Sequence, residues 1–132
     1  MSDAAGMSQR ILVVDEDRAL CESLDLLLES YEFELRTCRD VREARKVAAD
    51  FAPGVVLVEL KVPEADILRF CKEMRAVEPP APVVLLTVQG LDAVTVGKAV
   101  ASAGADGFVE KPFEAMAVLR RARSIAEERG DG

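Results

Sequence analysis

Unbroken apolar runs and one alternating segment mark the predicted strands of the chain. The unbroken runs are Ile11–Val14, Val55–Val58, Val83–Leu86 and the shorter Phe108–Val109. Continuous β-branched and leucine runs are typical of strands that are buried on both faces of a sheet. The alternating segment, Phe33–Cys38, predicts a strand nearer the sheet edge.

Between these strands, apolar residues recur at the spacing of an amphipathic helix. The predicted helices span residues 19–28, 41–51, 67–77, 91–103 and 116–128. We expect Asp17, Asp40 and Asp66 to cap the first three, because an aspartate side chain can accept hydrogen bonds from the free N–H groups of a first turn.

Strand and helix alternate about five times, which predicts a parallel sheet with helices on both faces. The 132 residues fit one domain. We expect this α/β domain to span residues 10–128, with a loose tail at 1–9 and a tail or linker at 129–132. Whether the chain acts alone or was cut from a longer regulator stays open.

Charge and composition exclude several classes of protein. The net charge of −7 argues against nucleic-acid binding, and no apolar run approaches the roughly 20 residues that cross a bilayer. The cytoplasm is therefore the expected compartment. Three scattered cysteines and no histidine argue against a zinc site or a Cys/His nucleophile, and predict buried free thiols. The basic run Arg120, Arg121 and Arg123 is predicted to be a solvated helix face.

Polar residues stand where the predicted strands end, at Asp15, Glu59, Thr87 and Lys111. Parallel strands end on one rim of the sheet, so these residues should meet in a single pocket. Asp15, Glu16 and Glu59 would place three carboxylates close together, which is costly without a cation. Lys111 supplies one positive charge, and Mg²⁺, which prefers oxygen ligands, could supply more.

Four segments carry a resemblance to a known family. They are Val13–Asp17, the strand that ends at Glu59 with its following loop, Val84–Thr87 and Gly104–Phe113. In order and spacing they resemble the receiver domain of two-component response regulators. The resemblance implies a doubly wound, flavodoxin-like (CheY-like) (βα)5 fold with strand order 2-1-3-4-5. It also implies an aspartate, at the end of the third strand, that takes a phosphoryl group from a histidine kinase.

The family's other site residues carry over onto this chain one at a time. Asp15 and Glu16 match the acidic pair that helps to hold Mg²⁺, with glutamate in the second place a variation. Thr87 and Lys111 match the hydroxyl and the lysine that contact the phosphoryl group. By resemblance, the bond from Lys111 to Pro112 is expected to be cis.

The acceptor position departs from the family pattern, because Glu59 stands where the aspartate is expected. Its extra methylene moves the carboxylate, and a displacement of about 1 Å can cost about a hundredfold in rate. We therefore expect no efficient phosphorylation at Glu59, and Mg²⁺ binding that is weak or absent. Two further departures are Ile67, where the family keeps a small residue, and Phe108, a switch aromatic without a hydroxyl.

The expected function is signalling by protein–protein contact rather than enzymatic catalysis. The resemblance names a histidine kinase or an effector as partner, or a second copy docked through the fourth helix, fifth strand and fifth helix, with Phe108 and Pro112 on that switch face. A further hypothesis is that Glu59 reaches Thr87 or Lys111, imitates a phosphoryl group and holds the domain in an active-like state.

Two alternatives remain open, a pseudo-receiver scaffold that does not use the acidic pocket and, less favoured, a small α/β enzyme. A flavin protein would need a Ser/Thr/Gly-rich phosphate loop where this chain has Asp15–Asp17, and no GxGxxG motif is present for a dinucleotide. A Ser-His-Asp hydrolase is excluded because the chain has no histidine.

Overall fold

The computed structural model describes residues 10–17, 34–77 and 81–129. Within them, five strands form one parallel sheet in the order β2-β1-β3-β4-β5, which confirms the predicted order. The strands are β1 (Arg10–Val14), β2 (Glu34–Cys38), β3 (Val55–Glu59), β4 (Val83–Val88) and β5 (Gly107–Glu110). The alternating segment forms the edge strand β2, as predicted.

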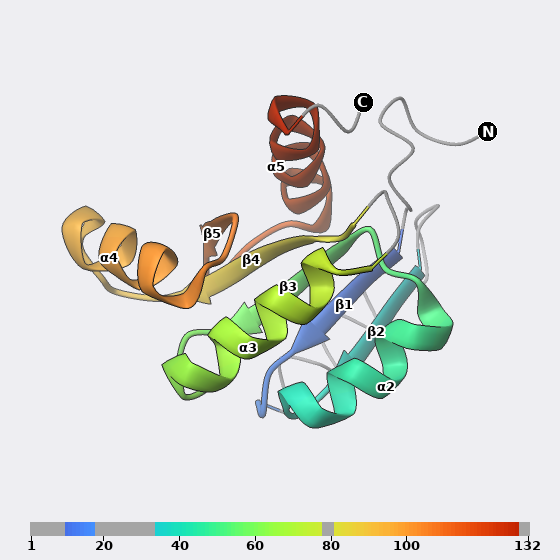
Figure 1. The fold of residues 1–132 in the computed structure, drawn as a ribbon. Coiled ribbons are helices and arrows are strands. Elements are labelled where there is room, and N and C mark those ends of the chain that lie inside the picture. Colours follow the sequence, from blue (N-terminus) through green and yellow to red (C-terminus); the bar gives the residue numbers. More distant parts are fainter. Residues whose placement is uncertain (1–9, 18–33, 78–80, 130–132) are drawn as a thin grey trace.

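Four helices cover the sheet in the described residues, and they are α2 (Val41–Phe51), α3 (Glu64–Arg75), α4 (Ala93–Ala103) and α5 (Ala115–Glu128). Figure 1 shows α2 and α3 across one face of the sheet and α5 on the other. The core is split in the same way, because α2, α3 and α4 pack on one layer of buried strand residues and α5 packs on the opposite layer. The predicted helix at 19–28, and with it the capping role of Asp17, lies outside the described residues.

Strand β3 lies at the centre of the sheet, and all five of its residues are buried. Val56 and Val58 face the layer under α2 and α3, whereas Val55 and Leu57 face the layer under α5. Burial on both faces explains the unbroken apolar run, since no position of the strand points to water. Glu59 is the residue that ends this strand, so its carboxyl reaches the rim of the sheet.

The helix caps were predicted correctly at one of the two described positions. The Asp40 side chain accepts a hydrogen bond from the Glu43 N–H at 2.8 Å and caps α2. The predicted cap at Asp66 is wrong, because α3 begins at Glu64 with Pro63 as its N-cap. The fixed φ of proline suits the start of a helix, so Asp66 lies in the first turn, where its charge still favours the helix dipole.

The cysteine and arginine predictions can also be compared with the structure. Cys38 and Cys71 are buried, as predicted, and burial raises the pKa of Cys71 to about 11, whereas the third cysteine, Cys21, lies outside the described residues. Arg120 and Arg121 are exposed, but Arg123 is half-buried, so the solvated face is narrower than predicted. In the part of the chain that the structure describes, no helix is long and apolar enough to cross a membrane.

Candidate functional site

The structure brings the four polar strand ends together at one rim of the sheet. Glu59 and Thr87 lie side by side, because they are register partners in β3 and β4. Asp15 directly follows β1, and Lys111 directly follows β5. A cleft of about 1210 Å³ opens above them and is lined by Glu59, Thr87 and Lys111, among others. The shared rim follows from the parallel topology, which places the carboxyl ends of all the strands on one side.

Lys111 is the central cation of this cleft. Its Nζ lies 2.7 Å from Asp15 Oδ2 and 3.5 Å from Glu59 Oε1. Asp15 is almost completely buried, with 1% of its side chain exposed, whereas 16% of the Lys111 side chain is exposed. The lysine therefore neutralises a carboxylate that has lost nearly all of its water, an arrangement that needs a close partner. The peptide bond between Lys111 and Pro112 is cis, as the family resemblance implies.

The pKa values of Glu59 and Asp15 shift in opposite directions. Burial raises the pKa of Glu59, and its hydrogen bond with Asp15 and the charge of Asp15 raise it further, while Lys111 and Lys61 offset part of the effect. For Asp15, burial alone would raise the pKa, but hydrogen bonds from Lys111, the Asp17 N–H and Glu59 together hold it below its usual value. When the pair holds a single proton, that proton therefore favours Glu59 over Asp15.

The pKa of Lys111 shifts upward, whereas burial alone would shift the pKa of an amine downward. Burial alone would lower the pKa of Lys111, but the hydrogen bond to Asp15 and the negative charges of Asp15 and Glu59 raise it above its usual value. Lys111 therefore stays charged throughout the pH range in which the two carboxyls titrate.

Thr87 is buried at the rim, and its Oγ1 has no hydrogen-bond partner among the described residues. The Glu59 carboxyl thus contacts Asp15 and Lys111 rather than the hydroxyl beside it. A buried hydroxyl without a partner costs about 1–3 kcal/mol, so such groups usually face a ligand or water. Of the two contacts predicted for Glu59, the structure contains the one to Lys111 and lacks the one to Thr87.

The predicted magnesium ligands do not form a coordination group in this arrangement. Glu16 is exposed at the cleft wall, while the Lys111 ammonium lies within ion-pair distance of both Asp15 and Glu59. In the described segments, no group of three or more Asp, Glu, Cys or His side chains could hold a metal ion. In this arrangement the lysine ammonium, rather than a set of oxygen ligands, lies beside the two buried carboxylates.

Sequence reasoning missed two basic residues of the cleft. Lys61 lies in the loop after β3, with its Nζ 3.8 Å from Glu59 Oε1, and Arg39 follows β2 and lines the cleft. The rule that gathered the other strand ends also applies to β2, so Arg39 could have been found. Lys61 had only its position two residues beyond Glu59 as a signal. Phe108, on β5, is exposed, and Pro112 lines the cleft.

We predict that Glu59→Gln raises the free energy of unfolding at neutral pH by on the order of 1 kcal/mol, the net contribution of one intramolecular hydrogen bond. A raised pKa means that the fold favours protonated Glu59, so its contribution to stability is present below the usual value of 4.5 and is lost as the pH rises through the folded value. Glutamine keeps a donor toward Asp15 at every pH. Urea unfolding should show a gain at neutral pH that closes below pH 4.5. The exposed Glu64→Gln is the control, and an equal gain there would contradict the prediction.

Comparison with known proteins identifies the family to which this site belongs. Residues 11–123 match the family model described as the response regulator receiver domain. The response regulator MprA of Mycolicibacterium vanbaalenii is 35% identical over 119 residues, which cover 90% of this chain and 51% of that protein. The chain thus spans about half the length of the curated relatives it matches.

Solved structures share both the fold and part of the sequence. A signal receiver domain from Bermanella marisrubri is 29% identical with a TM-score of 0.67, over 89% of this chain and 98% of that one. The beryllofluoride-activated NtrC4 receiver domain dimer gives 29% identity and a TM-score of 0.67, over 91% and 98%. The matched sequence, the sheet order and the acidic rim with its lysine agree with one another, and the chain belongs to the response regulator receiver domain family.

Proposed function

We propose that this receiver domain is not phosphorylated efficiently at Glu59 and acts through contacts with protein partners. The proposal rests on the contacts that the Glu59 carboxyl already makes with its neighbours. Its carboxyl is hydrogen-bonded to Asp15 and lies 3.5 Å from the Lys111 ammonium. The extra methylene of Glu59 displaces its carboxylate from the acceptor position, and the cation that would balance an incoming phosphoryl group is already paired with Asp15.

The same contacts support the proposal that Glu59 partly imitates a phosphoryl group. A phosphoryl group in this family engages both the hydroxyl and the lysine, whereas Glu59 engages Lys111, and Thr87 Oγ1 has no hydrogen-bond partner within the described part of the chain. We propose that Glu59 supplies one of these two contacts and so biases the domain only partly toward an active-like arrangement. A modest difference in interaction energy between two states is enough to shift their populations.

The proposed docking surface is the face formed by α4, β5 and α5. Three large apolar side chains are exposed on these elements, and they are Val94, Phe108 and Met116. The partners proposed for it are a histidine kinase, a downstream effector or a second copy of the chain. The NtrC4 neighbour is described as a receiver domain dimer, which supports the last of these for a protein of the same fold.

Incubation with acetyl phosphate and Mg²⁺, followed by intact mass measurement, tests the proposal. We expect no phosphoryl adduct on the wild-type chain under conditions that modify an ordinary receiver domain run in parallel. A stable adduct mapped to Glu59 would refute it.

A Mg²⁺ titration followed by backbone amide shifts separates the proposal from the alternative of a bare scaffold. A cleft whose lysine competes with the metal predicts small shifts at Asp15, Glu16 and Glu59 that appear only at high Mg²⁺ concentration. A scaffold that has lost its acidic site predicts no localised shift at any concentration. Saturation at low concentration would contradict the weak binding proposed here.

A further inference from the structure

The Lys111 ammonium depends on the placement of β5, the shortest strand of the sheet and one of its edges. β5 has four residues and pairs only with β4 among the described strands. An edge strand of this length has few ladder bonds to hold it in place. Something beyond that ladder must therefore fix the strand that delivers Lys111 to the cleft.

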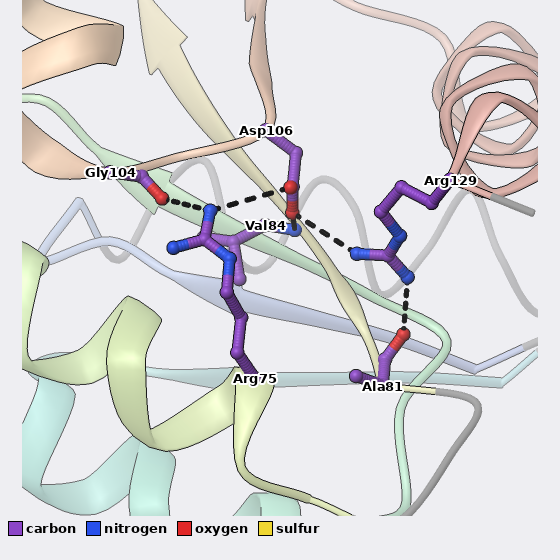
Figure 2. A network of polar contacts seen from close by, with 6 residues as sticks. All are labelled: Arg75, Ala81, Val84, Gly104, Asp106 and Arg129. Carbon is purple, nitrogen blue, oxygen red and sulfur yellow. Dashed lines mark hydrogen bonds and ion pairs between the residues drawn. The ribbon is translucent and has the colours of Figure 1, made fainter. Parts of the chain in front are cut away.

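A network of charged and backbone groups holds the opposite end of β5, and Figure 2 shows its six residues. The Asp106 carboxylate accepts a hydrogen bond from the Val84 N–H at 2.8 Å, and the Asp106 N–H donates to the Val84 carbonyl at 2.8 Å. These two bonds lock Asp106 onto the start of β4, directly before β5 begins.

Two arginines from different helices converge on the same carboxylate (Figure 2). Arg75, the last residue of α3, lies 3.5 Å from Asp106 Oδ1 and also donates to the Gly104 carbonyl at the end of α4. Arg129, the C-cap of α5, lies 3.6 Å from Asp106 Oδ2 and donates to the Ala81 carbonyl at 2.8 Å. Asp106 is thus joined to α3, α5 and β4, with only 10% of its side chain exposed.

Gly107, the first residue of β5, is also closely packed between side chains of α5 and β4. A Cβ built on Gly107 would come within 3.3 Å of Arg121 Nη2, Ile125 Cδ1 and Leu85 Cδ2. A larger residue at this point would push these side chains away by a few tenths of an ångström, because the strand passes closely between α5 and β4. From Asp106 to Lys111, an extended chain spans about 16 Å at roughly 3.3 Å per residue. The strand β5 therefore links the position of Lys111 to that of Asp106.

We propose that Asp106 is a positioning residue for Lys111, which it holds in the acidic cleft by fixing β5 from its far end. At the near end, the Lys111 N–H donates to the Val88 carbonyl at 2.8 Å, and its Nζ reaches Asp15 and Glu59. Loss of the charge at Asp106 breaks both ion pairs and loosens the strand. The Lys111 amine then spends more time away from its carboxylates.

The test is residue-resolved labelling of lysine amines with a limiting acylating reagent, quantified by mass spectrometry. In wild type, Lys111 should react slowly because its amine is paired and partly buried. In Asp106→Asn we expect its labelling rate to rise about threefold or more, the ratio that loss of a partly buried ion pair supports. Lys46 and Lys98, which are exposed and lie on other elements, should not change.

The matched control is Ala44→Gly at a buried position of α2, which lowers the stability of that helix by about 1 kcal/mol and does not involve β5. A rise at Lys111 in Asp106→Asn but not in Ala44→Gly supports positioning, whereas equal rises, or none in Asp106→Asn, overturn it. If Asp106→Asn does not fold, Arg129→Gln replaces it. Arg129→Lys, which keeps the charge, should restore slow labelling.

The inference rests on the role given to Lys111 in the proposed function, yet the two can fail separately. Amine labelling reports the placement of Lys111 and is independent of phosphorylation. A phosphoryl adduct on wild-type Glu59 with Lys111 labelling as expected would refute the proposed function and leave the role of Asp106 intact.

Discussion

Replacing Glu59 with aspartate is expected to give this domain an efficient phosphoryl acceptor. The shorter side chain withdraws the carboxylate from Asp15 and leaves room at the rim beside Thr87 Oγ1, which has no hydrogen-bond partner among the residues that the structure describes. In-line transfer depends on placement, and restoring about 1 Å can recover about a hundredfold in rate. The measurement is the rate of adduct formation with acetyl phosphate and Mg²⁺, followed by intact mass.

Two further variants separate placement from the mere presence of a carboxylate. Glu64→Asp makes the same chemical change on the exposed first turn of α3 and should leave the chain unmodified. Thr87→Ala in the Glu59→Asp background should slow the gain, because it removes the hydroxyl that would contact the phosphoryl group. If folded Glu59→Asp forms no adduct faster than wild type, the identity of residue 59 is not what limits the reaction.

Most of the fold was predictable because it depends on patterns that repeat. Runs such as Val55–Val58 are unbroken because both sides of a central strand are buried, and alternating strands and helices permit few topologies. The start of α3 was placed wrongly because two signals three residues apart, Pro63 and Asp66, competed. An aspartate that can cap was preferred over Pro63, whose fixed φ in fact sets the start of the helix.

The site was predictable in position but not in side-chain arrangement. Parallel strand ends must share a rim, so the meeting of Asp15, Glu59, Thr87 and Lys111 followed from topology alone. Which neighbour the Glu59 carboxyl contacts depends on local charges and rotamers, and the pattern of the sequence contains neither. The network around Asp106 was missed for a related reason. It joins residues from the ends of α3 and α5 that the sequence pattern does not bring together.

Removing the charge of Lys111 is expected to have the largest effect on stability. The Asp15 side chain is only 1% exposed, and in Lys111→Met its carboxylate loses the ammonium that lies 2.7 Å away. Breaking a buried pair by removing one partner costs about 3 kcal/mol or more, because the remaining charge stays buried without compensation. Urea unfolding at neutral pH should show this loss, and Lys98→Met, at an exposed position on α4, should show almost none.

The pH dependence of that loss identifies its cause. The pKa of Asp15 is held below its usual value of 3.8, so the stability it contributes is present above that pH and is lost as the pH falls through the folded value. Without Lys111 that contribution shrinks, and the gap between Lys111→Met and wild type should narrow as the pH falls below 3.8. Adding Glu59→Gln to Lys111→Met should recover part of the loss, because one of the two facing carboxyls becomes neutral. A gap that stays constant with pH would instead point to lost packing of the lysine stem, and the ion pair with Asp15 would then contribute little to the fold.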